Sequence, residues 1–167
     1  ITLASNAIFE DLSEWTDQDT FGQWYAQNTN ISSTIIDGSS ALDDFGSTIL
    51  IYQENNSCIE PIVFGFTIKN GIGTIGNRID PHTNGSCSEE NECIEGLAIG
   101  NECQSDSDCD IYQVRLGGGI LFDISNPIIK YNQFIGNGST NVYEGGAIYG
   151  TTEDEDWAFD NIPTFHY

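Results

Sequence analysis

Two segments of this chain repeat each other position by position although they begin 66 residues apart. Residues 61–71 read PIVFGFTIKNG and residues 127–137 read PIIKYNQFIGN. A third copy, PTFHY, begins at Pro163, so three of the four prolines in the chain occupy one position of the repeat. Self-similarity on this scale is typical of repeat architectures, in which each unit covers the apolar face of its neighbour.

The copies become evenly spaced when residues 80–110 are set aside. The second and third copies start 36 residues apart, and removing those 31 residues from the first interval leaves 35. A second motif supports this register, because GGGILF at 117–122 recurs as GGAIYG at 145–150. We therefore interpret residues 80–110 as an insertion into a repeated unit.

The repeated segments are predicted to be strands. They are short, rich in Ile, Val, Phe, Tyr and Thr, and bounded by Gly, Asn, Asp, Ser or Pro. Helical periodicity is confined to residues 6–15, which would make about two turns. The Asn-Gly steps at 70–71 and 137–138 suit tight corners that need a positive φ. The pattern predicts an all-β protein.

The motif series STIIDGSS, GFTIKNG, GGGILF, SNPIIKYNQFIGN and GGAIYG resembles the right-handed parallel β-helix repeat proteins of the pectate-lyase-like superfamily over residues 31–150. The resemblance implies an all-β solenoid with a disulfide-rich loop insertion. It also implies a piece of a longer protein, cut off mid-coil. The implied parts are an opening coil at 1–30, coils at 31–79, a Cys- and Asp-rich insertion at 80–110, and further coils at 111–167.

The net charge limits the partners of this chain. It has 26 acidic residues against 4 basic ones, for a formal charge of −22. Such a surface repels nucleic acid phosphates and anionic lipids, so we expect neither as a partner. No uninterrupted apolar stretch reaches the roughly 18 residues that a membrane span requires.

Four of the five cysteines lie close together, at Cys87, Cys93, Cys103 and Cys109. Their spacing lacks the CxxC pairs of zinc sites, so disulfides formed in an oxidising compartment are favoured over a zinc site. Of the three possible pairings, the symmetric intervals favour Cys87–Cys93 with Cys103–Cys109, without excluding the others. The remaining Cys58 is either a buried apolar side chain or a partner for a cysteine beyond this chain. We expect a secreted or cell-surface protein.

One acidic motif is a candidate calcium site. Asp106, Asp108 and Asp110 alternate in QSDSDCD, and a turn would bring their carboxylates together as hard oxygen ligands for Ca²⁺. The alternative is a solvated acidic loop braced by a disulfide. A second acidic run, residues 153–156 with Asp160, is a weaker candidate.

The signal for catalysis is weak. The superfamily contains polysaccharide lyases and hydrolases but also non-catalytic surface proteins, so the fold does not decide the activity. The lyases use an Arg or Lys base. Lys69 lies at the Asn-Gly corner, and Lys130 lies at a repeat position that Phe64 and His166 occupy in the other copies, a variation typical of outward-facing residues. The hydrolases would show NTD and GHG motifs, which are missing beside the acidic pair Asp43–Asp44.

We therefore expect a non-catalytic segment of an extracellular β-helical surface protein that acts as a rigid scaffold, an adhesive surface or an assembly subunit. Its partners would be polysaccharide or other surface proteins, and its one expected ion is Ca²⁺. The alternative is a carbohydrate-active enzyme or a carbohydrate-binding β-helix. In that case Trp15, Trp24 and Trp157 would stack on sugar rings.

Overall fold

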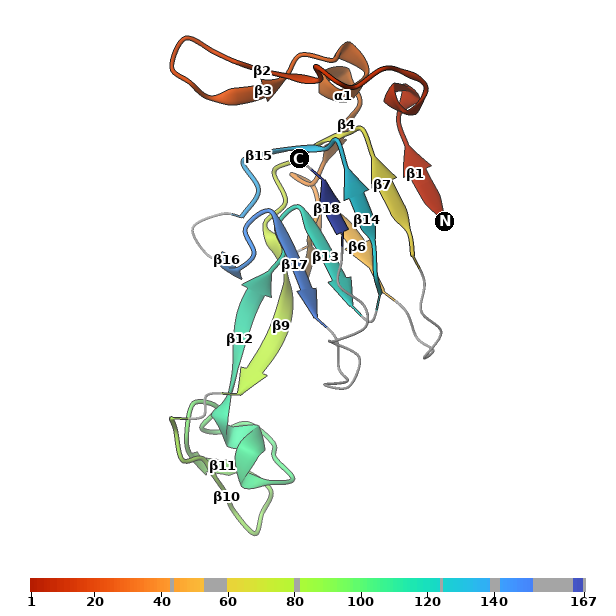
Figure 1. Cartoon of the computed structure of the whole chain (residues 1–167). Helices are drawn as coiled ribbons and strands as arrows, with labels where there is room; N and C mark the ends of the chain where they lie inside the picture. Colours follow the sequence, from red (N-terminus) through yellow and green to blue (C-terminus); the bar gives the residue numbers. More distant parts are fainter. Residues whose placement is uncertain are drawn as a thin grey trace.

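The computed structural model describes residues 1–42, 44–52, 60–79, 82–123, 125–138, 142–151 and 164–166. Figure 1 shows a body of short stacked strands, a cap with a hairpin at one end, and a small lobe at the end of a long ribbon. Several residues singled out in the sequence lie outside the described residues: Asp43, Cys58, Glu153, Asp154, Glu155, Asp156, Trp157, Asp160 and Pro163.

The repeated segments lie side by side in a parallel four-stranded sheet. Its strands, in spatial order, are β1 (Thr2–Ala4), β7 (Ile62–Phe64), β14 (Ile128–Lys130) and β18 (Thr164–His166). Ile62 faces Ile128, and Ile129 in turn faces Phe165. The alignment of the three copies is confirmed, because matched positions are paired positions.

Two three-stranded parallel sheets repeat this arrangement. One contains β15 (Gln133–Ile135), β8 (Thr67–Lys69) and β4 (Ile35–Asp37), and the other contains β17 (Ile148–Thr151), β13 (Ile120–Asp123) and β6 (Ile49–Ile51). Ile120 faces Ile148, as the recurrence of GGGILF as GGAIYG predicts. The main core lies between these sheets and consists of the buried residues Val63, Phe66, Ile68, Ile120, Phe122 and Ile129.

The fourth large sheet breaks the parallel pattern. It has the order β16 (Val142–Glu144), β12 (Ile111–Leu116), β9 (Gly73–Ile79), β5 (Phe45–Gly46). Strand β9 pairs antiparallel with both β12 and β5, whereas coils of a solenoid would pair in parallel. The right-handed parallel β-helix expected from the sequence is therefore wrong. In the part of the chain that the structure describes, the strands form several small separate sheets, parallel and antiparallel, and no solenoid.

The cap consists of two short helices and an antiparallel hairpin. Its elements are η1 (Asn6–Phe9), β2 (Thr16–Gln18), β3 (Trp24–Ala26) and α1 (Thr29–Ser33). The helical pattern seen over 6–15 yields only the single turn of η1. Ala7, Leu12, Ala26 and Ile31 form a small core of their own, against which Trp15 and Tyr131 pack. Within the described residues, no helix is long and apolar enough to cross a membrane.

Candidate functional site

The segment between β9 and β12 folds into a separate lobe, residues 82–110, which we call the cysteine module. It contains β10 (Ser86–Cys87), β11 (Cys93–Glu95) and η2 (Asp106–Asp110). The ribbon formed by β9 and β12 carries it away from the body, and Ile79 faces Ile111 where the ribbon enters the module. Because the two ends of the module are paired, its position relative to the ribbon is defined by backbone hydrogen bonds.

Two disulfides hold the module together. They join Cys87 to Cys103 and Cys93 to Cys109, with Cα atoms 5.9 and 5.3 Å apart. The adjacent pairing favoured from the symmetric spacing is therefore wrong, since the bridges interleave. Cys93, Cys103 and Cys109 are buried and form the module's core, against which Cys87 and Ala98 pack.

The same cysteines do not make a metal site. The sulfurs of Cys93, Cys103 and Cys109 lie within 4.8 Å of one another, the one such grouping of potential ligands found in the described part of the chain. Thiolates rather than disulfide sulfurs bind zinc, and Cys93 and Cys109 are bonded to each other.

Asp108 caps the first turn of η2. Its carboxylate accepts hydrogen bonds from the backbone N–H groups of Gln104 and Ser105, both at 2.8 Å, and from Ser105 Oγ at 3.1 Å. These donors stabilise the ionised form, so they lower the pKa of the Asp108 carboxyl below its usual range, with the Gln104 N–H contributing most. Asp108 therefore stabilises the start of η2.

The Asp106 and Asp110 carboxylates lie in different environments. Asp106 Oδ1 accepts a hydrogen bond from the Cys87 N–H at 2.8 Å and so ties η2 to β10. Asp110 is 8% exposed, and its Oδ1 has no hydrogen-bond partner among the described residues. A Cβ built on Gly85 or Gly96 would lie 2.8 or 2.9 Å from that oxygen, so both glycines leave it room. The three carboxylates are not gathered within 4.8 Å, and calcium binding by them stays a prediction.

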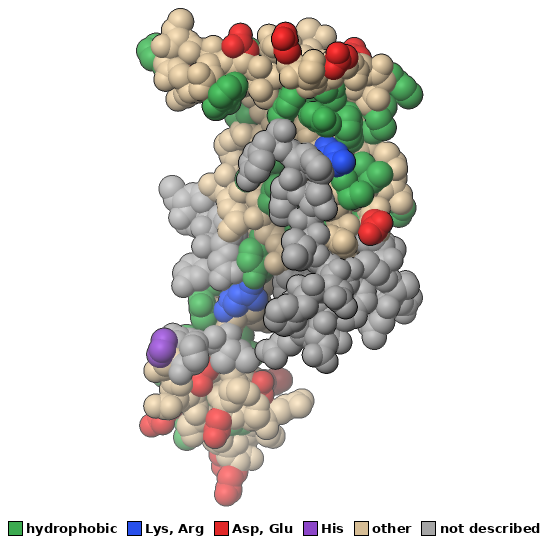
Figure 2. Space-filling view, viewed as in Figure 1, with side chains coloured by type: hydrophobic (Ala, Val, Ile, Leu, Met, Phe, Trp, Pro, Cys, Tyr) green, Lys and Arg blue, Asp and Glu red, His purple; other side chains and the backbone are tan. Residues whose placement is uncertain are grey.

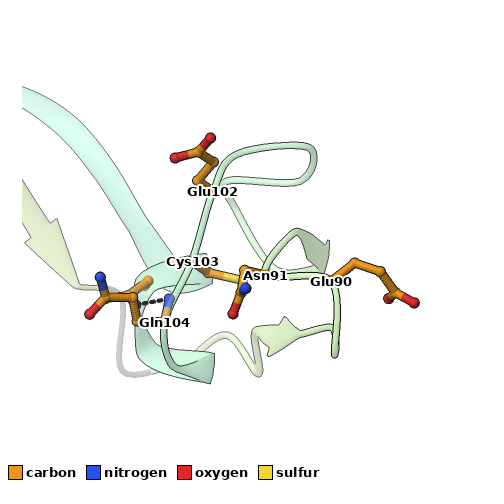
Figure 3. Close-up of a pocket in the computed structure, with 6 residues that line it drawn as sticks. Glu90, Asn91, Glu102, Cys103 and Gln104 are labelled. Carbon is orange, nitrogen blue, oxygen red and sulfur yellow. Dashed lines mark hydrogen bonds between the residues drawn. The ribbon is translucent and has the colours of Figure 1, made fainter.

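A depression of about 790 Å³ opens on the module beside the Cys87–Cys103 bridge. The lining residues are Glu90, Asn91, Glu102, Cys103, Gln104 and Asp108. Figure 3 shows the Glu90 and Glu102 carboxylates extending from different segments, well apart from each other. The module carries eight acidic residues and no Lys or Arg, so the depression suits a cationic group and excludes an anionic one.

Three aliphatic side chains of the module are left in solvent. Ile94, Leu97 and Ile99 are 57%, 49% and 67% exposed. Ile94 lies in β11, and the loop that bears Leu97 and Ile99 is held in place because the N–H groups of Leu97 and Ala98 donate to the Cys109 carbonyl. Sequence reasoning missed these side chains. The available signal was IEGLAI, an apolar run within an otherwise acidic stretch.

The two lysines and the two described tryptophans have distinct environments. Lys69 Nζ lies 3.1 Å from Asp37 Oδ2, and Lys130 lies in β14 of the four-stranded parallel sheet. Trp15 packs edge-on against Tyr131, with ring centroids 5.8 Å apart, whereas Trp24 is 68% exposed. Of the aromatic residues considered for sugar stacking, Trp15 is thus engaged in packing and Trp24 is available.

Comparison with protein-family models, with curated proteins and with solved structures gives no match to this chain. The predicted membership of the pectate-lyase-like superfamily is therefore wrong, as is the fold expected from it. Neither a family model nor the arrangement of the sheets supports it.

Proposed function

We propose that the chain is a non-catalytic structural segment of an extracellular protein, which acts as a scaffold or adhesive element and presents the cysteine module as its contact surface. The observation that carries this proposal is the position of the module. A lobe with its own disulfide core stands at the end of a paired ribbon, away from the main body. Exposed sites on rigid supports are typical of recognition elements.

The chemistry of the module supports the same proposal. Interleaved disulfides persist in oxidising, extracellular surroundings. Three exposed aliphatic side chains supply apolar contact area, and the surrounding carboxylates favour a partner of opposite charge. A backbone fixed by disulfides and hydrogen bonds loses little conformational entropy when a partner binds.

Removing the module tests the proposal. Residues 80–110 would be replaced by an Asn-Gly turn joining Ile79 to Ile111, which already face each other. Beads coated with the intact or the shortened chain would then be passed over surfaces coated with a basic protein, a neutral polysaccharide or the chain itself. We expect the intact chain to be retained on at least one surface and the shortened chain to be lost from it.

Two controls make the result interpretable. Far-ultraviolet circular dichroism must show that the shortened chain keeps its strands. Replacing Ile94 and Ile99 by Ser in the full chain removes apolar surface without changing charge, and it should reduce retention. Equal retention of intact and shortened chains would reject the module as the contact surface. Release of unsaturated or reducing ends from pectin or alginate would favour the enzyme alternative.

A further inference from the structure

The hairpin of the cap has one face that is buried at its base and uncovered at its outer end. In the β2–β3 register Thr16 faces Ala26 and Gln18 faces Trp24, so these four side chains lie on one side of the ribbon. Ala26 is 6% exposed within the cap core, but Trp24 is 68% exposed. Figure 1 shows the hairpin running sideways from the cap past the strands of the body. The face that carries Trp24 therefore extends beyond the elements that cover its base at Ala26.

The outer end of the hairpin is ordered. Asp19 Oδ1 accepts hydrogen bonds from the N–H groups of Phe21 and Gln23 at 2.8 and 2.9 Å. The Asp19 carbonyl accepts from the Gly22 N–H at 3.0 Å, and Gly22 has a φ of +78°, which a glycine adopts without strain. Phe21 and Trp24 are thus presented by a hydrogen-bonded turn. Preorganised aromatic side chains of this kind are enriched at binding surfaces.

The charge around the hairpin selects the partner. The first 68 residues contain no Lys or Arg, so the chain itself offers no nearby cation for the Trp24 ring within that stretch. The cap carries the acidic residues Glu10, Asp11, Glu14, Asp17 and Asp19, and Figure 2 shows acidic side chains along this end of the molecule. Trp is the side chain whose ring face attracts cations most strongly, and the acidic residues of the cap as a whole increase the local concentration of cations around it.

We propose that the Trp24 face of the β2–β3 hairpin docks a segment of another protein that bears arginine or lysine, with the cation above the Trp24 ring and the Gln18 amide as a hydrogen-bonding neighbour. The aromatic ring and the acidic surroundings each attract that cation, and the same acidic surroundings repel anionic lipid and nucleic acid. This surface lies in the cap and not in the cysteine module, so the inference goes beyond the proposed function.

The test is a calorimetric titration of the full chain with a hexa-arginine peptide and with its hexa-citrulline counterpart. Citrulline has nearly the same shape as arginine but no charge. Trp24→Ala leaves the net charge of the protein unchanged, so general electrostatic attraction is held constant. We expect the arginine peptide to bind about two- to fivefold more weakly to Trp24→Ala, Trp24→Phe to be intermediate, and the citrulline peptide not to bind.

The matched control is Phe9→Ala, because Phe9 is another exposed aromatic residue of the cap, 87% exposed. Its affinity for the arginine peptide should equal that of the original chain. Unchanged binding by Trp24→Ala, or an equal loss in Phe9→Ala, would overturn the proposal. So would Trp24-dependent binding of a neutral oligosaccharide in place of the arginine peptide. Circular dichroism of each variant distinguishes lost docking from lost folding.

Discussion

Asn137 joins its own copy of the repeat to Gly71 of the preceding copy, whose N–H donates to Asn137 Oδ1 at 3.0 Å. The amide nitrogen of Asn137 donates in turn to the Ile68 carbonyl at 2.7 Å. One side chain therefore contacts a backbone donor just beyond β8, at Gly71, and a backbone acceptor within β8, at Ile68. Asn132 makes the equivalent pair of contacts with Phe66 and Val63.

Replacing Asn137 by Ala should destabilise the body. The change removes the acceptor of the buried Gly71 N–H and one donor to the Ile68 carbonyl, which costs about 1–3 kcal/mol of unfolding free energy. Chemical denaturation followed by circular dichroism measures the loss. Asn84→Ala, at an exposed asparagine of the cysteine module, should change the stability by less than about 0.5 kcal/mol. Similar losses in both variants would contradict a role for the bridge.

The two disulfides should differ in how much they stabilise the cysteine module, although they close loops of equal size. Both join residues 16 apart, so the conformational entropy that each removes from the unfolded chain corresponds to about 3 kcal/mol of stability. Cys93 and Cys109 are 1% and 0% exposed, whereas Cys87 is half-buried. The double replacement Cys93→Ala with Cys109→Ala should therefore open the module to proteolysis more than Cys87→Ala with Cys103→Ala. Equal cleavage rates would show that burial adds nothing to loop closure.

The registers of β7 with β14 and of β13 with β17 were predictable from this sequence because these strands pair at matched positions of the repeated motifs. Ile62 with Ile128, and Ile120 with Ile148, could be aligned without coordinates. The assembly of the strands was not predictable, because the direction in which β9 and β12 pair depends on how the chain returns from the cysteine module. Periodicity within a strand contains no information on that return path.

In the candidate site, too, some features could be predicted from the sequence and others could not. The sequence identified the four cysteines of the module but not their partners, since equal spacing is compatible with every pairing. Asp108 was identified as a potential ligand, whereas its capping of η2 depends on a helical turn that only the fold provides. The exposure of Trp24 likewise follows from the overhang of the hairpin and not from its sequence neighbours.

Asp37 should make stability depend on acid pH. The Asn70 amide and the Ser39 N–H each donate to Asp37 Oδ1 at 3.0 Å, and Lys69 contacts the other oxygen. With the Asn70 amide contributing most, these donors hold the pKa of the Asp37 carboxyl well below its usual range. A lowered folded-state pKa stabilises the protein above the unfolded-state pKa, near 4, and the contribution is lost as the pH falls below it.

The measurement for Asp37 is a comparison of melting temperatures between pH 7 and pH 2. Asp37→Asn should melt below the original chain at pH 7, and the difference should shrink as the pH falls below about 4. Ser39→Ala retains the backbone donor and removes only the contribution of the Ser39 hydroxyl, which is smaller than those of Asn70, the Ser39 N–H and Lys69, so this control should keep most of the pH dependence. A difference that is constant over the whole range would show that the charge of Asp37 contributes nothing.

Calcium at millimolar concentration should raise the melting temperature of the chain modestly. Extracellular calcium modules commonly bind with dissociation constants of about 10⁻⁴–10⁻³ M, which gives a small stabilisation at that concentration. The expected ligands are Asp106, Asp108 and the buried, unpaired Oδ1 of Asp110, and binding requires η2 to adjust so that these oxygens converge. The double variant Asp106→Asn with Asp108→Asn should lose the calcium response.

The behaviour of that variant without calcium separates metal binding from capping. Three donors converge on one charged oxygen of Asp108. Asp108→Asn keeps an accepting oxygen but loses the charge that strengthens these bonds, so it should lower the melting temperature even in a chelator. Asp106→Asn keeps an oxygen that can accept the Cys87 N–H, so its effect in chelator should be smaller. Differential scanning calorimetry with and without calcium gives both quantities. A calcium response that survives in the double variant would place the ion elsewhere. No response in the original chain would leave these aspartates with their structural tasks alone, namely to cap η2 and to tie it to β10.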